Sequence, residues 1–322
     1  MHGGTCMKFS SDTPLKFRED GTFHILMISD LQETYETLDK TLTDIVRLID
    51  KTNPDLLVIG GDIVGFTDPQ LLKPYLDKLF HPIEERGLYW MHIFGNHDHD
   101  LTADSKEITK LYEQYAHCLS DHEDTLHGAT NYVVPVSSAD GEHIRFTLWG
   151  LDTNNTIDTA GIQTDENFHR MKRPEVCSIW DFVHFDQLMW YWNTSAALEQ
   201  KEGEPVPGIM FTHVAPWEFQ FLVDNPELTG CTGSTKERMG LSYLNSGLFA
   251  AVLQRKDICC IACGHSHDDD FDGTFCGIRC CMDASAGYSP YGEHELKGGR
   301  VFIIKEDNPR KLETYTVKFK DL

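Results

Sequence analysis

Hydrophobic and polar positions in the first third of the chain fall into blocks typical of alternating strands and helices. Three short apolar runs predict strands that are buried on both faces of a sheet: residues 24–29, 55–62 and 89–94. Between the first two runs, Leu38, Leu42 and Ile45 recur at helical spacing. This order of strand, helix and strand predicts a parallel sheet with right-handed crossover connections.

Capping residues mark the ends of the next two helices. Asp68 is the expected N-cap of a helix that has Pro69 in its first turn and Gly87 just past its end. A third helix should open near Asp104, where Glu107 three residues later completes a capping-box pattern.

The rest of the chain has a different texture. Strands at 130–138 and 143–153 flank a polar turn and predict a hairpin. Residues 154–183 and 217–240 show no period and are interpreted as irregular insertions. The remaining predicted elements are helices at about 185–198 and 247–254 and strands near 208–212, 258–263, 274–282, 300–305 and 312–319. Without internal repeats or a low-complexity linker, residues 1–322 are expected to form one α/β (mixed α+β) domain with two sheets.

Polar residues stand at the carboxyl end of five of these apolar strands. They are Asp30 and Gln32, Asp62, Asn96 to Asp98, His213, and His265 with His267. Ligands of open α/β sheets bind beyond the carboxyl ends of the strands, so these residues are expected to converge. Asp, Asn and His without a required Cys or Ser favour a site for a hard-to-borderline divalent metal.

The charge and hydrophobicity of the chain restrict the kinds of partner that it can bind. The chain has 51 acidic and 28 basic residues, a net charge of −23, which argues against nucleic acid or anionic lipid as a partner. No apolar run approaches the roughly 18 residues of a membrane helix, and the first residues show no secretory signal. A cytoplasmic protein without membrane contact is therefore expected.

The ten cysteines fit a reduced protein better than a disulfide framework. Five of them crowd residues 259–263 and 276–281, where Cys260, Cys263, Cys276 and Cys280 could be imagined as a zinc site. Both segments are predicted strands, whose successive side chains point to opposite faces. Buried cysteines of the core are the preferred interpretation.

The succession of strand-end residues resembles the calcineurin-like metallophosphoesterase superfamily. Its pattern is Asp-x-His, Gly-Asp, Gly-Asn-His-Asp/Glu, a single His and Gly-His-x-His, and the resemblance covers roughly residues 22–306. Further segments are similar to the plant branch labelled "inactive purple acid phosphatase" and to fungal phosphoprotein phosphatase relatives. These segments are residues 184–188, 211–216, 245–249, 264–271, 287–292 and 299–301.

This resemblance implies a four-layer αββα sandwich of two mixed sheets flanked by helices, with the site at one edge. It also implies two divalent metal ions, bridged by Asp62. Asp30 and His267 would complete the first ion's ligands, and Asn96, His213 and His265 those of the second. His97 corresponds to the non-ligand histidine that lies over the leaving group.

Two such ions about 3.5–4 Å apart can hold a bridging hydroxide and clamp phosphoryl oxygens. The hydroxide would attack phosphorus while protonated His97 donates to the departing oxygen. Either Asp98 or Asp68 could orient His97, and the sequence does not choose between them.

The chain departs from the family pattern at two positions. Gln32 replaces the expected histidine of the first metal, where its carbonyl oxygen could ligate directly or bond only to a metal-bound water. A looser first site that favours Mn²⁺ or Mg²⁺ over Zn²⁺ is expected, with Fe²⁺ also possible. Gly65 stands where purple enzymes carry their iron-binding tyrosine, so a purple Fe³⁺ enzyme is not expected.

Substrate contacts are assigned to Asn96, His97, Tyr288 and Arg300, with Tyr291 as a further candidate, whereas Trp180 is assigned to packing. The sequence thus predicts a phosphoesterase that acts on phosphomonoesters, as small molecules or phosphoproteins. A phosphodiesterase with the same metals and a non-catalytic metal-binding scaffold remain the alternatives.

Overall fold

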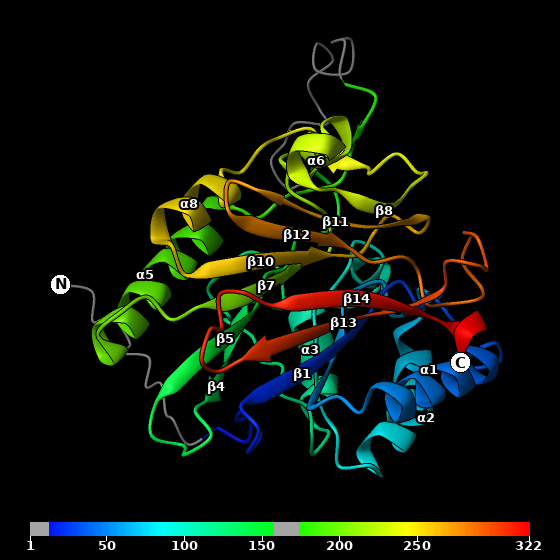
Figure 1. Cartoon of the computed structure of the whole chain (residues 1–322). Helices are drawn as coiled ribbons and strands as arrows, with labels where there is room; N and C mark the ends of the chain where they lie inside the picture. The colour runs from blue at the N-terminus through cyan, green and yellow to red at the C-terminus, as the bar shows by residue number, and fades with distance from the viewer. Residues whose placement is uncertain (1–12, 158–173) are drawn as a thin grey trace.

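Two large mixed β-sheets form the centre of the fold (Figure 1), and the computed structural model describes residues 13–157 and 174–322. The first sheet has the order β14-β13-β1-β2-β3. Its strands are β1 (Thr22–Ile28), β2 (Leu56–Ile59), β3 (Tyr89–His92), β13 (Gly298–Lys305) and β14 (Glu313–Lys318). As the alternation of strand and helix predicts, β1, β2 and β3 are parallel, and β13 runs antiparallel to β1.

The second sheet has the order β4-β5-β7-β10-β12-β11-β8. Its strands are β4 (Tyr132–Ser137), β5 (Ile144–Gly150), β7 (Gly208–Thr212), β8 (Thr232–Thr235), β10 (Ile258–Cys263), β11 (Asp269–Phe275) and β12 (Ile278–Met282). The predicted hairpin is confirmed, since β4 and β5 pair antiparallel. The central strands β5, β7, β10 and β12 are parallel, so β7 and β10 present their carboxyl ends at the same edge.

Helices cover the outer face of each sheet. On the first sheet they are α1 (Leu38–Thr52), α2 (Leu72–Glu84) and α3 (Ser105–Tyr112), which share one apolar cluster with β1, β2 and β3. On the second sheet they are α5 (Phe185–Glu202), α6 (Phe219–Asp224) and α8 (Leu248–Arg255). Figure 1 shows α1 and α2 at one side of the molecule and α5 and α8 at the other.

The inner faces of the two sheets pack against each other. Phe23, Ile25 and Val58 from the first sheet share one buried cluster with Phe211 and Ala262 from the second. Strands that are apolar on both faces are required here, because one face meets the helices and the other meets the opposite sheet. The four-layer αββα sandwich predicted from the sequence is confirmed.

Capping side chains begin two helical segments as expected. Asp104 accepts hydrogen bonds from the backbone N–H groups of Lys106 and Glu107 at the start of α3. Asp68 caps a short 3₁₀ segment, Pro69–Leu71, that leads into α2.

The prediction that residues 217–240 are irregular was wrong. This stretch contains α6, a second short helix α7 (Pro226–Thr229) and strand β8, which pairs with β11. These elements are only four to six residues long, too short for a hydrophobic period to identify them. Most of the predicted insertion 154–183 lies outside the described residues, apart from 154–157 and 174–183.

The cysteines of the central strands are core residues, as predicted. Cys260 and Cys281 lie between the two sheets, whereas Cys263 and Cys280 belong to the cluster under the helices. Cys276 is exposed. Thiols on opposite faces of a sheet cannot bind one zinc ion, so Cys260, Cys263, Cys276 and Cys280 do not form a zinc site. Among the described helices, none combines the length and apolar character that a bilayer crossing needs.

Candidate metal centre

Five strand ends from both sheets meet at one edge of the sandwich. Asp30 follows β1, Asp62 follows β2 and Asn96 follows β3, while His213 follows β7 and His265 with His267 follow β10. The ligand atoms of two triplets lie within 4.8 Å of one another: Asp62, His213 and His265, and Asp30, Asp62 and His267. Asp62 is common to both, which is the position expected of a bridging carboxylate.

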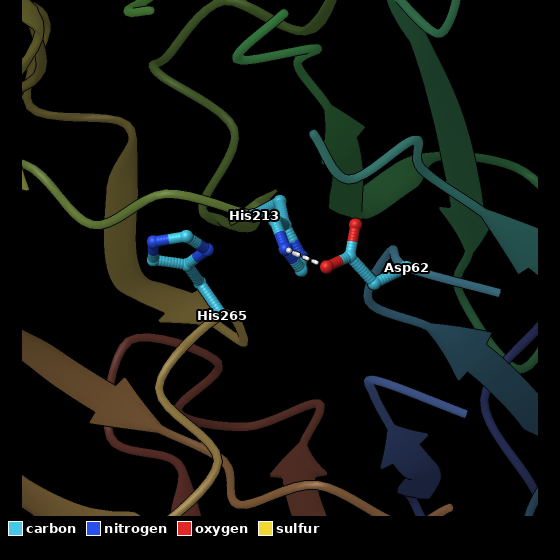
Figure 2. A group of neighbouring side chains, drawn as sticks. All are labelled: Asp62, His213 and His265. Atoms are coloured by element: carbon cyan, nitrogen blue, oxygen red, sulfur yellow. Dashed lines mark ion pairs between the residues drawn. The ribbon is translucent and has the colours of Figure 1, made fainter. Parts of the chain in front are cut away.

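Individual distances show how tight the cluster is. His213 Nε2 lies 3.3 Å from Asp62 Oδ2 and 3.7 Å from Asp30 Oδ1, and His267 Nε2 lies 3.3 Å from Asp30 Oδ1. Figure 2 shows His213 between Asp62 and His265, with the ion pair to Asp62 marked. These separations leave room for cations that each bind several of the side chains.

Several buried polar atoms of the cluster have no hydrogen-bond partner. They are Asp30 Oδ1, His213 Nε2 and both side-chain atoms of Asn96. Leaving a buried polar atom unpaired costs about 1–3 kcal/mol, so native proteins rarely gather such atoms in one place. Metal ions bound by these atoms would remove this cost, and the donor set fits divalent cations.

Outer contacts orient two of the histidines. His213 Nδ1 lies 2.7 Å from the carbonyl oxygen of Gly60, and His267 Nδ1 lies 3.0 Å from that of Tyr291. A carbonyl can only accept, so each Nδ1 carries the donated proton and each Nε2 is directed to the centre as a potential ligand.

The charges of the cluster shift the pKa values of its histidines. Burial opposes protonation of His213, but Asp62 and Asp30 outweigh it and raise the pKa of His213 to about 10. Burial and the neighbouring His213 lower the pKa of His265 to about 3. Without metal, one protonated imidazole therefore compensates part of the carboxylate charge, and His265 is neutral.

The backbone is strained at the same residues. Among the described non-glycine residues, eight have positive φ, and four of them are Asp30 (54°), Gln32 (41°), Asp62 (51°) and His265 (75°). Such conformations cost free energy and cluster at functional sites. Gly95 is required by close approach, because a Cβ there would collide with Asp62 Oδ1.

Asp98 does not orient the His97 side chain, as one of the two predictions for this residue held. Its buried carboxylate accepts hydrogen bonds from the backbone N–H groups of Ile63 (2.9 Å) and Gly95 (2.8 Å). Burial and the nearby Asp62 raise the pKa of Asp98 to about 7. Asp98 thus ties together the loops after β2 and β3.

Asp68, the other candidate partner of His97, caps its own helix. The side-chain partner of His97 is Asp100, whose Oδ2 lies 2.7 Å from His97 Nδ1. The backbone N–H of His97 donates to Asp62 Oδ1 at 2.8 Å. His97 is therefore held against the shared carboxylate by its backbone and against Asp100 by its side chain.

Gln32 is turned toward the shared carboxylate. Its Nε2 donates to Asp62 Oδ2 at 3.0 Å. A half-turn of the amide would instead present the carbonyl oxygen, the only atom of this group that can ligate a cation. Gln32 thus reaches the centre, at the position expected for the first metal.

Tyr288 and Arg300, predicted to bind substrate, do not lie at the centre. The Tyr288 hydroxyl donates to Asp44 of α1 at 2.9 Å, and Lys40 lies 3.4 Å above its ring. Arg300 is 1% exposed in β13 and pairs with Asp270 at 2.9 Å. A buried guanidinium must be paired with a carboxylate, so the position of Arg300 inside a strand commits it to Asp270 and not to a substrate.

Two aromatic side chains touch the centre instead. The Tyr291 ring stacks on His267 with centroids 4.0 Å apart. Trp180 makes edge contacts with His97 (5.7 Å) and His265 (5.5 Å). Trp180 was assigned to packing, and the aperiodic sequence around it carries no signal that could have placed it here.

A cavity of about 320 Å³ adjoins His97 and Gln32. Its lining comprises Gln32, Val64, Gly65, Phe66, Thr67, His97, Asp100, Ser289 and Pro290. A volume of this size suits a small-molecule group or one side chain of a larger substrate.

Sequence comparisons identify relatives of the chain. It is similar to probable inactive purple acid phosphatase 14 of Arabidopsis thaliana, 26% identical over 313 residues that cover 87% of this chain and 74% of the relative. It is also similar to the phosphatase DCR2 of Saccharomyces cerevisiae, 24% identical over 80% of this chain and 46% of that protein.

Solved structures share the fold. A dimetal phosphatase from Danio rerio aligns with a TM-score of 0.55 and 15% identity, covering 92% of this chain and 99% of that one. GAP50, the anchor in the inner membrane complex of Plasmodium, aligns with a TM-score of 0.58 and 12% identity over 93% of this chain and 85% of that one.

The family model named calcineurin-like phosphoesterase matches residues 23–269, a span that runs from β1 to the first residue of β11 and includes every strand end of the metal centre. With the αββα sandwich and the shared Asp62, this match means that the chain belongs to the calcineurin-like phosphoesterase family.

Proposed function

We propose that this chain is an active phosphoesterase that uses two divalent ions, preferably Mn²⁺, to hydrolyse phosphomonoesters. The observation that carries the proposal is that Asp62 belongs to two groups of ligand atoms. Within each group, the ligand atoms lie within 4.8 Å of one another. Bound there, a pair of cations would supply Lewis acidity toward water and neutralise phosphoryl charge. The oxygen-rich first group, Asp30, Asp62 and Gln32 with one imidazole, supports Mn²⁺ or Mg²⁺.

The protein side chains have separate tasks in this proposal. Asn96 and His97 would contact the phosphoryl group and the leaving group, and the cavity lined by Gln32 and His97 would hold the organic part. His97 is the general acid. As the ester bond breaks, its electron pair goes to the departing oxygen, which takes a proton from the imidazole.

A non-catalytic scaffold is the second candidate, because several relatives carry the word inactive in their names. The arrangement around His97 supports activity. A protein that only binds metal has no use for an imidazole that makes no metal contact yet is held beside the shared carboxylate and paired with Asp100.

Turnover of p-nitrophenyl phosphate and bis(p-nitrophenyl) phosphate by the Mn²⁺-loaded protein tests the proposal. We expect the monoester to be the better substrate and His97→Ala to lower kcat by about 10²–10⁴-fold. Metal content should be unchanged in this variant, since the backbone N–H that meets Asp62 remains.

Faster hydrolysis of the diester would instead assign a phosphodiesterase. Two bound ions without turnover of any phosphate ester would contradict the proposal and support the scaffold.

A further inference from the structure

The His97 side chain is the first member of a chain of hydrogen bonds. His97 Nδ1 donates to Asp100 Oδ2 at 2.7 Å, and the other oxygen of Asp100 accepts from Asn155 Nδ2 at 2.8 Å. With Nδ1 committed to Asp100, Nε2 is the nitrogen left to face a substrate. Asn155 lies 55 residues from Asp100 in the sequence and follows β5 of the opposite sheet.

Backbone pairing fixes Asn155 relative to a second contact of His97. Thr156 and Trp180 form an antiparallel bridge, and the N–H of Asp181 donates to the carbonyl of Asn155 at 3.1 Å. Trp180 in turn meets the His97 ring edge-on, with centroids 5.7 Å apart and planes at 73°. The two paired segments, 155–156 and 180–181, therefore contact His97 in two ways: Asn155 through Asp100, and Trp180 directly against the imidazole ring.

We propose that Asp100 and Asn155 are positioning residues that orient His97 for proton donation to the leaving group, with Trp180 limiting the rotation of its ring. The inference rests on the proposed function. During hydrolysis the P–O bond of the ester breaks and its electron pair goes to the departing oxygen. That oxygen takes the Nε2 proton of the His97 imidazolium, which leaves a neutral imidazole with its proton on Nδ1. Water supplies the oxygen of the new P–O bond, and its released proton restores His97.

A purely structural role for these contacts is disfavoured by their exposure. The His97 and Asp100 side chains are 43% and 42% exposed, and ion pairs in such positions contribute little to stability. The hydrogen bond from Asn155 fixes the orientation of the Asp100 carboxylate without burying it. The arrangement matches that of an imidazolium whose Nδ1–H is held by a carboxylate that is itself oriented, so that Nε2–H faces the leaving group.

The dependence of rate on the leaving group separates positioning from folding. Phenyl phosphate needs protonation of its leaving oxygen, whereas 2,4-dinitrophenyl phosphate does not. We expect Asp100→Asn to lower kcat/KM for phenyl phosphate by about 30–100-fold, and Asn155→Ala by about 5–10-fold. Both should change the value for 2,4-dinitrophenyl phosphate by less than about threefold, because this reaction bypasses the acid.

Three controls complete the experiment. Asp68→Asn removes a nearby exposed carboxylate that makes no contact with His97, and should leave both rates unchanged. In the His97→Ala background, Asp100→Asn and Asn155→Ala should cause no further loss on phenyl phosphate. Nitrogen NMR of the metal-free protein should show the Nδ1–H tautomer of His97 in the parent and its loss in Asp100→Asn.

Equal losses on both esters, or further losses without His97, would overturn the positioning role while leaving the phosphoesterase intact. Absence of turnover by the metal-loaded parent on either ester would overturn the proposed function, and the positioning role with it.

Discussion

The two groups of ligands that share Asp62 differ in the kind of ligand atom that they offer. The second group adds Asn96, His213 and His265, and the first two of these are fully buried with unpaired atoms. The first group adds Asp30, His267 and Gln32. The Gln32 amide donates to Asp62, and Gln32 lines the cavity. The second group therefore offers two imidazoles, one buried (His213) and one partly exposed (His265), whereas the first offers one imidazole and mainly oxygen. Unequal affinities for the two ions follow.

Removing the shared carboxylate should have the largest effect on this comparison. Asp62→Asn loses the one side chain that both groups use, so both ions should bind at least about 100-fold more weakly. Equilibrium dialysis with elemental analysis of bound Mn²⁺ measures this directly. Asn96→Ala is the matched variant and should weaken only the second ion. Retention of one tightly bound ion by Asp62→Asn would show that the carboxylate is not shared.

Strengthening the first group should produce a smaller change. Gln32→His supplies a second imidazole at the first group, which should raise its affinity about tenfold and shift its preference toward Zn²⁺. Metal titrations of the parent and the variant, side by side, provide the measurement. An unchanged affinity would show that position 32 does not ligate the metal and that Gln32 acts only through Asp62 or a bound water.

The protonation state distinguishes the two imidazoles of the second group. His213, whose pKa is about 10, carries a proton at pH 7 in the metal-free protein, whereas His265, whose pKa is about 3, does not. Binding at the second group must displace the His213 proton, so about one proton is released and affinity falls as the pH is lowered. Calorimetry in two buffers with different ionisation enthalpies reports this number. Binding heats that do not depend on the buffer would contradict the protonated state of His213.

Much of the centre could be predicted because its residues follow regular elements. Apolar runs locate the strands, and the topology of parallel strands brings their carboxyl ends together, so Asp30, Asp62 and His213 could be placed before any coordinates. The pattern predicted two sheets, and the resemblance to the metallophosphoesterase superfamily implied the four layers, which suit strands that are apolar on both faces.

The remaining features depend on tertiary packing that leaves no period in the sequence. Tyr288 directly precedes Ser289 and Pro290, which line the cavity beside His97, but its ring turns to α1. Arg300 has the chemistry of a phosphate ligand but lies inside a sheet. Asp98 and Asp68 were the partners of His97 that the sequence offered. The structure instead pairs His97 with Asp100, because the short helix Asp98–Asp100 turns Asp98 toward the backbone of Gly95 and Asp100 toward the imidazole.

Anomalous diffraction from crystals of the Mn²⁺-loaded protein tests the central claim most directly. The account predicts two peaks about 3.5–4 Å apart with the Asp62 carboxylate between them, and a lower occupancy at the peak next to Gln32. A single peak, or two peaks that do not share Asp62, would contradict it.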